Sequence, residues 1–283
     1  MALFYNQATL SYSGGTVSSN ITAGEILEVL SVTKTAVVDE YSQGSDITYA
    51  INIVNTGATA YNALTITDDL GAYSFEGDIL QPLEYLDGSV KYFINGALQM
   101  SPAVTAGPPL VITGITVPAG GVATILYTAR ATAFASPAVD GIIVNTATVN
   151  GGGVTEITVT ATVTAENEPN LSIVKSVSPT TVAENGQITY TFVIQNTGNT
   201  AAVETDNVVI TDTFDPILNN ITATYNGGVW TSPDNYTYDE TTGVFTTVLG
   251  AITVPAATYT QDPETGRFTV EPGVATITVT GTI

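Results

Sequence analysis

A duplicated pattern of alternating side chains constrains this chain most strongly. The segment DITYAINIVNTG at 46–57 returns as QITYTFVIQNTG at 187–198, with apolar residues at every second position in both copies. A period of two is typical of a β-strand with one buried face. Further pairs follow in the same order, namely LSVTKTAVV (30–38) with LSIVKSVSP (171–179), LTITDDL (64–70) with VVITDTF (208–214), and KYFINGAL (91–98) with ATYNGGVW (223–230). The sequence is therefore a tandem repeat of many short strands.

Turn-forming Gly, Asn, Asp and Pro separate these strands at short intervals, and no long stretch has the 3.6-residue period of a helix. Such spacing predicts an Ig-like antiparallel sandwich for each repeat. We expect an all-β protein with two tandem Ig-like antiparallel β-sandwich domains, at 29–166 and 171–283, joined by the linker ENEPN.

The two repeats end at different points. The first continues past GVATILYTARA through IVNTATV (143–149) and VTEITVTATV (154–163), whereas the second stops at GVATITVTGTI. The second domain should therefore be incomplete and lack its last strand or two. A copy of the missing part stands at the other end of the sequence, where FYNQATLSYSGG (4–15) matches IVNTATVNGGG (143–153) at a constant offset of 139 residues.

We therefore interpret residues 1–24 as a donor segment that completes domain two, because an open sandwich exposes unpaired backbone groups. Only about five residues join this donor to domain one, a reach of roughly 17 Å. A domain of this size is roughly 37 Å across. Insertion into a neighbouring copy, repeated as an open head-to-tail filament, is favoured over self-closure or a small ring.

Strand alternation also indicates which polar residues face inward. In domain one, Lys34 shares a face with apolar neighbours, as do Asp68 and Asn145. Domain two repeats the first two as Lys175 and Asp212. Its third member would come from the inward face of the donor, which consists of Phe4, Asn6, Ala8 and Leu10.

A buried lysine is driven toward the neutral amine, and a buried aspartate toward its protonated form. Beside an asparagine, this set can form an isopeptide bond: the amine attacks the carboxamide carbon, the aspartate transfers protons, and ammonia leaves. The alternative is a buried Lys–Asp ion pair that is hydrogen-bonded to the asparagine without a covalent bond. The chain contains no Cys, so no disulfide can serve as the cross-link.

The segments TKTAVVDEYSQGSDITYAINIVNTG, LTITDDL and IVNTATV resemble the conserved-repeat family of bacterial surface proteins, also called domain of unknown function eleven. The Lys, Asp and Asn layout is also similar to that of self-crosslinking Ig-like domains of Gram-positive pilins and adhesins. This resemblance implies a Lys34–Asn145 bond assisted by Asp68, and a Lys175–Asn6 bond between protomers assisted by Asp212. The donor departs from the family pattern, with NQATL in place of NTATV.

Charge and composition exclude several classes of function. The net charge of −21 disfavours nucleic acid and anionic membrane surfaces as partners. Without Cys or His, the chain has neither the commonest metal ligands nor a Ser-His-Asp triad. No apolar run is long enough for a membrane span, and MALFYNQATL lacks the features of a secretory signal. We expect no cofactor, no metal and no membrane insertion.

Three functions remain. The favoured one is a structural protomer of an extracellular, cell-surface or spore-surface fibre of a bacterium, with itself as partner and at most autocatalytic cross-linking. The second is a surface adhesin or carbohydrate-binding module, which could use Trp230 and the nearby tyrosines. The third, a hydrolase with paired carboxylates, is weakest, because Asp68 and Asp212 occupy equivalent core positions of separate domains. The acids Asp206 and Asp215 fit solvated turns better than a Ca²⁺ site.

Overall fold

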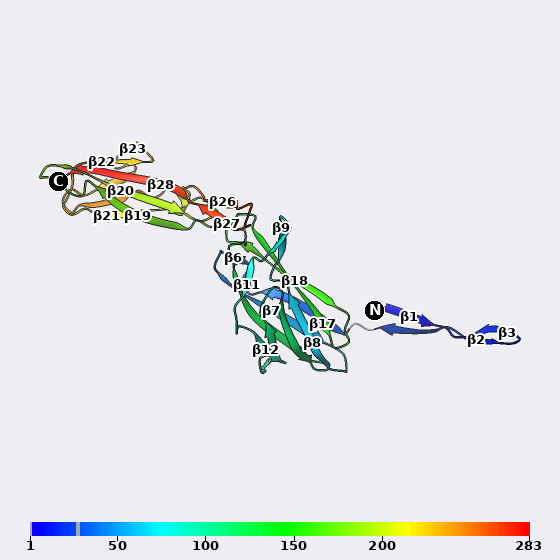
Figure 1. Ribbon diagram of the computed structural model, residues 1–283. Helices are drawn as coiled ribbons and strands as arrows, with labels where there is room; N and C mark the ends of the chain where they lie inside the picture. Colours follow the sequence, from blue (N-terminus) through cyan, green and yellow to red (C-terminus); the bar gives the residue numbers. More distant parts are fainter. Residues whose placement is uncertain (1, 27–28) are drawn as a thin grey trace.

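A computed structural model describes residues 2–26 and 29–283 and confirms the all-β fold (Figure 1). Two β-sandwich domains follow one another, and a long hairpin formed by the N-terminal residues projects beyond domain one. In the described part of the chain, the only helical turn is the 3₁₀ turn Glu204–Asp206, and no helix is long and apolar enough to cross a membrane.

Domain one consists of two antiparallel sheets packed face to face. The first has the strand order β13-β12-β16-β7-β5, and β11 also pairs with β16. Its strands are β5 (Leu30–Ala36), β7 (Asp46–Asn55), β11 (Leu83–Tyr85), β12 (Lys91–Ile94), β13 (Ala97–Leu98) and β16 (Val122–Ala131).

The second sheet has the order β14-β15-β8-β17-β18-β6, with β18 and β6 parallel and the other pairs antiparallel. Its strands are β6 (Glu40–Tyr41), β8 (Tyr61–Asp68), β14 (Ala103–Thr105), β15 (Leu110–Val117), β17 (Ile142–Gly151) and β18 (Ile157–Ala165). A small separate hairpin, β9 (Tyr73–Phe75) with β10 (Asp78–Leu80), extends from the domain.

The strand period builds the core of domain one. Ile47, Tyr49 and Ile51 of β7 are completely buried, and so are Leu64 and Ile66 of β8 on the facing sheet. β18 lies against β5, which closes one side of the sandwich. Nonlocal strand pairing of this kind stabilises each strand through the apolar surface that it buries.

Domain two repeats the first sheet, except for a counterpart of β11, in the order β23-β22-β28-β20-β19. Its second sheet has only the order β21-β25-β24, which corresponds to β8-β15-β14 of domain one. Among the described residues, no strand occupies the places that β17, β18 and β6 fill in domain one. The strands are β19 (Leu171–Ser178), β20 (Gln187–Asn196), β21 (Thr211–Thr213), β22 (Asn219–Tyr225), β23 (Gly228–Trp230), β24 (Tyr236–Tyr238), β25 (Val244–Thr247) and β28 (Gly273–Thr282).

Domain two also has a hairpin without a counterpart in domain one, β26 (Thr258–Gln261) with β27 (Phe268–Glu271). It reaches domain one: the backbone N–H of Phe268 donates to the carbonyl of Ala133 at 2.8 Å, and Gln261 Nε2 donates to the hydroxyl of Tyr73 at 3.1 Å. The guanidinium of Arg267 lies 5.6 Å from the ring centre of Phe134. This hairpin therefore braces the joint between the domains.

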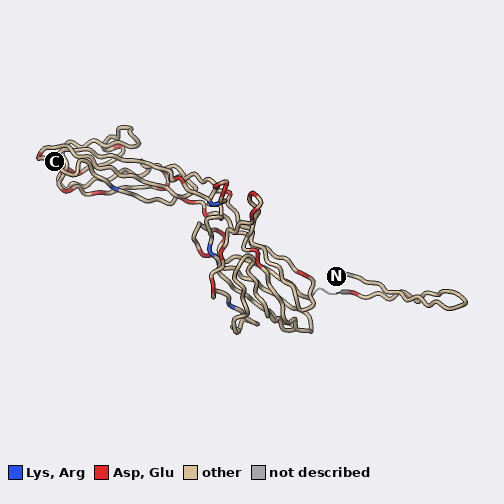
Figure 2. The backbone as a smooth tube through the Cα atoms, viewed as in Figure 1, with Lys and Arg blue, Asp and Glu red and all other residues tan. Residues whose placement is uncertain are grey.

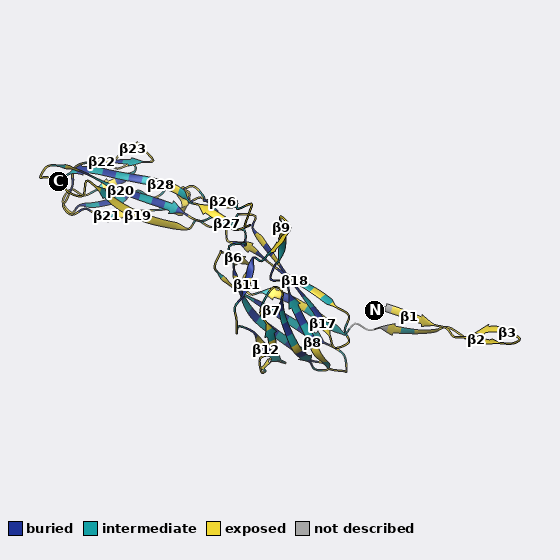
Figure 3. Cartoon of the chain, in the orientation of Figure 1, coloured by how far each residue is buried: buried dark blue, intermediate teal, exposed yellow. Residues whose placement is uncertain are grey.

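The N-terminal segment pairs with itself. β1 (Ala2–Asn6) pairs with β4 (Thr22–Ile26), and β2 (Thr9–Tyr12) pairs with β3 (Gly15–Ser18). The described side chains of these strands are largely exposed (Figure 3). The segment is thus a two-stranded ribbon with almost no core of its own, and isolated ribbons of this kind are marginally stable.

Candidate cross-link sites and the open groove of domain two

The structure brings the three predicted polar residues of domain one together in its core. Lys34 lies on β5, Asp68 ends β8, and Asn145 lies on β17. Lys34 Nζ is 2.8 Å from Asp68 Oδ2, and both side chains are fully buried. Asn145 is also fully buried. The alternation of apolar residues thus predicted which side of each of three strands faces the core, although these strands are distant in the sequence.

A fourth residue, Tyr127 on β16, connects this cluster. Its hydroxyl donates to Asp68 Oδ2 at 2.5 Å and accepts a hydrogen bond from Asn145 Nδ2 at 3.0 Å. The other carboxylate oxygen of Asp68 accepts from the backbone N–H of Leu70 at 3.1 Å. Asn145 Oδ1 is buried, and the described residues offer it no hydrogen-bond partner. The carboxamide is therefore held by its nitrogen, while its oxygen is left free.

Burial and charge act in opposite directions on the lysine. Loss of hydration lowers the pKa of Lys34 from its usual value, and the nearby Asp68 carboxylate only partly offsets this. The amine also lies 5.2 Å from the ring centre of Tyr49, which stacks on Tyr127. An apolar, aromatic surrounding of this kind favours the neutral amine, which is the nucleophilic form.

Domain two contains the same Lys–Asp pair in a more open setting. Lys175 forms an ion pair with Asp212, but 39% of the lysine side chain and 18% of the aspartate side chain are exposed. The amine lies among aromatic rings and is 4.6 Å from the ring centre of Tyr190, the counterpart of Tyr49. At the position of Tyr127, domain two has Val279.

The exposure of Lys175 belongs to an open side of domain two, between the edges of β19 and β21 that no other described strand pairs with; we call this side the groove. The first sheet ends at β19, where Ile173 is 53% exposed although it alternates with the lysine on the same face. The second sheet ends at β21, which pairs with β25 on one side only among the described strands. In domain one, the β17–β18 pair fills this space: β17 pairs with β8, and β18 lies against β5. Among the described residues, no strand pair covers the corresponding side of domain two.

The predicted donor residues lie on the N-terminal hairpin, far from this groove in the isolated protomer (Figure 1). Phe4 and Leu10 are 53% and 64% exposed, and Asn6 and Ala8 are exposed as well. The hairpin is nearly free of charge, because Glu25 is the one charged residue among positions 2–26 (Figure 2). The hairpin thus exposes several large apolar side chains, among them Leu3, Phe4 and Leu10, on an almost uncharged part of an acidic protein.

The other predicted candidates have structural roles. Trp230 stacks on Tyr225 with ring centres 5.1 Å apart, and both Trp230 and Tyr236 are buried in the core of domain two. These aromatic residues therefore do not form an open platform for a sugar. Asp206 Oδ2 accepts a hydrogen bond from the backbone N–H of Val203. Within the described residues, no group of three or more acidic side chains is arranged to hold a metal ion.

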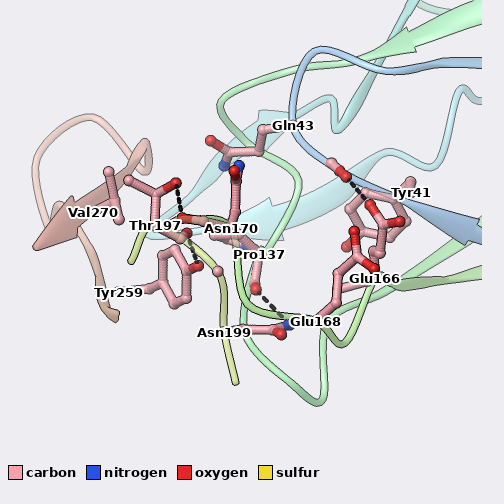
Figure 4. Close-up of a pocket in the computed structure, with 13 residues that line it drawn as sticks. Tyr41, Gln43, Pro137, Glu166, Glu168, Asn170, Thr197, Asn199, Tyr259 and Val270 are labelled. Carbon is pink, nitrogen blue, oxygen red and sulfur yellow. Dashed lines mark hydrogen bonds between the residues drawn. The ribbon is translucent and has the colours of Figure 1, made fainter. Parts of the chain in front are cut away.

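A pocket of about 190 Å³ lies at the joint between the domains (Figure 4). Asn199 reaches across it, and its Nδ2 donates to the carbonyl of Pro137 and to Asn167 Oδ1, both at 3.1 Å. Beside it, the hydroxyl of Tyr259 donates to the carbonyl of Thr197 at 2.6 Å. These bonds help the β26–β27 hairpin to fix the joint, which makes the pocket a structural feature of the joint.

Sequence reasoning missed Tyr127 and the bracing role of β26–β27. For Tyr127 a signal existed, because Ile125, Tyr127 and Ala129 alternate inward on β16 and only the tyrosine has a polar group to satisfy. For the hairpin there was no signal, since its contacts with domain one depend on how the two domains are placed.

Comparison with known proteins gives structural similarity only. No family model and no curated protein matches the sequence. The pilus backbone RrgB from Streptococcus pneumoniae is 15% identical over 86% of this chain and 55% of its own length, with a TM-score of 0.36. This chain thus spans about half of RrgB.

Two other solved structures are similarly distant. The major pilin subunit BcpA of Bacillus cereus is 12% identical over 96% of this chain and 73% of its own length, with a TM-score of 0.36. The collagen-binding domain from a Staphylococcus aureus adhesin is 13% identical over 50% of this chain and 100% of its own length, with a TM-score of 0.30.

Proposed function

We propose that this chain is a structural protomer of an extracellular or spore-surface fibre, in which the N-terminal hairpin of one protomer fills the groove in domain two of the next. One observation carries the proposal. The base of the hairpin, β1 with β4, has the strand pairing of the β17–β18 pair of domain one, and domain two has a groove where that pair would lie.

The match between the hairpin and the β17–β18 pair extends to the register of the base strands β1 and β4. The tip strands β2 and β3 are shifted by one residue, because Leu10 pairs with Val17 whereas its counterpart Val149 pairs with Ile157. In domain one, Asn145 is paired with Ala161. In the hairpin, Asn6 is paired with Thr22, and each of these residues lies 139 positions before its counterpart. The sequences of β4 and β18 share almost no residues, so this agreement in pairing is independent of the similarity between FYNQATL and IVNTATV.

The inward face of the hairpin fits a buried role. The positions that match Phe4, Ala8 and Leu10 are Ile143, Ala147 and Val149, and each of these is at most 2% exposed in domain one. In the hairpin, the ring of Phe4 covers Gly24, its paired residue. In domain one, the equivalent pair is Ile143 with Val163, two residues of intermediate size. The hairpin has a large residue, Phe4, and a small one, Gly24, at these two positions.

The positions of the strand ends favour insertion into a different protomer. β17 begins and β18 ends at the edge of domain one that faces domain two, so the base of the hairpin belongs at the edge of domain two remote from domain one. Each domain is spanned by ten-residue strands of about 33 Å. Only the residues between Ile26 and Leu30 join the hairpin to the opposite edge of domain one, a reach of roughly 14 Å. Self-closure in this register would require a reach of about two domain lengths.

Head-to-tail insertion then continues without a natural end. Each protomer presents one hairpin and one groove, and the two surfaces differ, so the contact is heterologous and builds an open filament. The arrangement is a form of β-strand addition in which main-chain pairing supplies affinity and the inward side chains supply register. The net charge of −21 keeps such a filament soluble and repels phosphate backbones.

We further propose that isopeptide bonds reinforce the filament. Within domain one, Lys34 Nζ forms a bond to Asn145 Cγ, the Cγ–Nδ2 bond breaks, and ammonia leaves with a proton that came from the amine. Between protomers, Lys175 reacts in the same way with Asn6, and Asp212 transfers the proton. The buried Lys34, Asp68 and Asn145 cluster supports the first bond, and the equivalent Lys175–Asp212 pair beside the groove supports the second.

Deletion of residues 1–26 tests assembly. We expect the full chain to form filaments in electron micrographs and a ladder that survives boiling in SDS, whereas the deleted chain stays monomeric and caps filaments when it is added to full-length protein. The deleted chain retains the bond of domain one, which intact-mass measurement detects as the loss of one ammonia. Filaments formed by the deleted chain would disprove the role of the hairpin.

A further inference from the structure

We infer that Tyr127 is a catalytic residue of the bond-forming reaction in domain one and passes a proton from Asp68 to the departing ammonia. This inference rests on the proposed Lys34–Asn145 bond and assigns a role that neither the repeat nor the Lys, Asp and Asn set supplies.

The hydrogen bonds of the Tyr127 hydroxyl carry the inference. The hydroxyl contacts Asp68 Oδ2, the same oxygen that lies 2.8 Å from the amine of Lys34. It also contacts Asn145 Nδ2, the atom that must leave as ammonia. The described structure therefore contains a continuous path of polar contacts from nucleophile to leaving group, an ion pair followed by two hydrogen bonds.

The reaction balances along this path. Before attack, Asp68 holds the proton that makes the amine of Lys34 neutral. In the resting cluster Tyr127 donates to Asp68 and accepts from Asn145, so both hydrogen bonds must reverse for the transfer. Attack of Nζ on Cγ of Asn145 makes that carbon tetrahedral and gives Nδ2 a basic lone pair. The hydroxyl then turns, Asp68 Oδ2 gives its proton to the oxygen of Tyr127, and Tyr127 gives its own hydroxyl proton to Nδ2. The Cγ–Nδ2 bond then breaks and ammonia leaves. Asp68 finally takes one proton from Nζ, so both Asp68 and Tyr127 return to their starting forms.

The surroundings of the phenol suit a relay that never holds a charge. Burial, with a further contribution from the Asp68 carboxylate, raises the pKa of Tyr127 well above its usual value. The phenol therefore stays protonated, and it acts by exchanging one proton for another. Stacking on Tyr49, with ring centres 5.4 Å apart, holds the ring in place.

Domain two lacks this relay, because Val279 occupies the position of Tyr127. Asp212 must then reach the leaving group without an intermediate hydroxyl. The two reactions should consequently differ in rate even after the donor hairpin has filled the groove, with the bond inside domain one forming first.

The test compares Tyr127→Phe with Tyr49→Phe in the full chain, both in an Asn6→Ala background so that domain one alone can lose ammonia. Tyr49 is the matched control, because its ring stacks on Tyr127 and its hydroxyl, although it lies close to Asn145, forms no hydrogen bond of normal length with Asp68 or any other described residue. Chains are made by cell-free synthesis, quenched in denaturant at intervals and weighed. We expect Tyr127→Phe to lose ammonia about 100-fold more slowly, the size of a general acid effect, and Tyr49→Phe to follow the parent rate.

Equal rates for Tyr127→Phe and the parent would overturn the relay and leave the isopeptide bond standing. Failure of the parent itself to lose ammonia would instead remove the covalent part of the proposed function, and the relay with it. Should Tyr127→Phe fail to fold, as shown by loss of cooperative unfolding, the parent rate in mixtures of light and heavy water decides the question. A relay that moves two protons together gives a curved dependence on the heavy-water fraction, and a straight line contradicts it.

Discussion

The hairpin offers a matched pair of substitutions that separates docking from every other role of this segment. Phe4 and Tyr5 are neighbours on β1 and are similarly exposed in the isolated protomer, at 53% and 66%. Their counterparts in domain one differ sharply, because Ile143 is 2% exposed and Val144 is 47% exposed. Docking should therefore bury Phe4 and leave Tyr5 in solvent.

The magnitude follows from the surface that changes. Complete burial of a phenylalanine side chain contributes about 3 kcal/mol at the upper end, and truncation also leaves a cavity. Since about half of the Phe4 ring is already covered in the hairpin, we take about 2 kcal/mol for Phe4→Ala. At 1.4 kcal/mol for each factor of ten, the joint should weaken roughly 30-fold. For Tyr5→Ala, an exposed position in both states, we expect a change below about threefold.

The assay measures the protein concentration at which half of the protomers are assembled, by light scattering, in an Asn6→Ala background that prevents covalent trapping. Phe4→Ala should raise this concentration roughly 30-fold, while Tyr5→Ala leaves it nearly unchanged. Equal weakening by both substitutions would show that the hairpin does not dock with this face inward. No effect of Phe4→Ala would refute the reasoning altogether.

Three further outcomes follow from the described contacts. Lys34→Met removes both the buried partner of Asp68 and the proposed bond to Asn145, so domain one should lose at least about 3–5 kcal/mol of its free energy of unfolding in a denaturant titration; an unchanged midpoint would mean that Lys34 makes neither interaction in solution. Burial raises the pKa of Tyr41, Tyr49 and Tyr127, so the folded state keeps phenol protons that the unfolded chain loses above pH 10. The contribution of these residues to stability is therefore complete below pH 10 and falls as pH rises further; phenolate absorbance that matches an unfolded control at every pH would contradict this. Gly266 has a φ of +70° and lies against Leu80 of domain one, where a Cβ would come within 2.2 Å, so Gly266→Val should loosen the joint. Small-angle scattering should then show a broader range of interdomain angles, and an unchanged profile would show that the β26–β27 hairpin is not the brace.

The sequence predicted much of domain one because its repeated strands alternate strictly. Lys34 alternates with Val32 and Ala36, which was sufficient to place its amine in the core. The same alternation placed Lys175 on the inward face of the equivalent strand in domain two. It could not show how much of that lysine the open groove leaves exposed. The exposure of a side chain depends on which strands lie beside it. The alternation pattern describes only the strand on which the residue itself lies.

Other features depend on contacts that no local pattern encodes. The match of FYNQATL with IVNTATV identified one strand of the donor, whereas the second strand became visible only through the pairing of Asn6 with Thr22. Likewise, the packing of Gly266 and Arg267 on domain one depends on the geometry of the whole joint. Long-range packing of this kind outweighs local preference and remains outside sequence reasoning.

The central claim, insertion of the hairpin of one protomer into domain two of another, is tested most directly by isotope mixing. Equal amounts of ¹⁵N-labelled and unlabelled protein are assembled together, and the filaments are digested and analysed for peptides that join Asn6 to Lys175. We predict that linked peptides of mixed label are as abundant as those of uniform label, because each hairpin enters a groove chosen at random. Linked peptides of uniform label alone would show self-closure, and filaments whose Lys175 peptides carry no link to Asn6 would contradict the covalent joint.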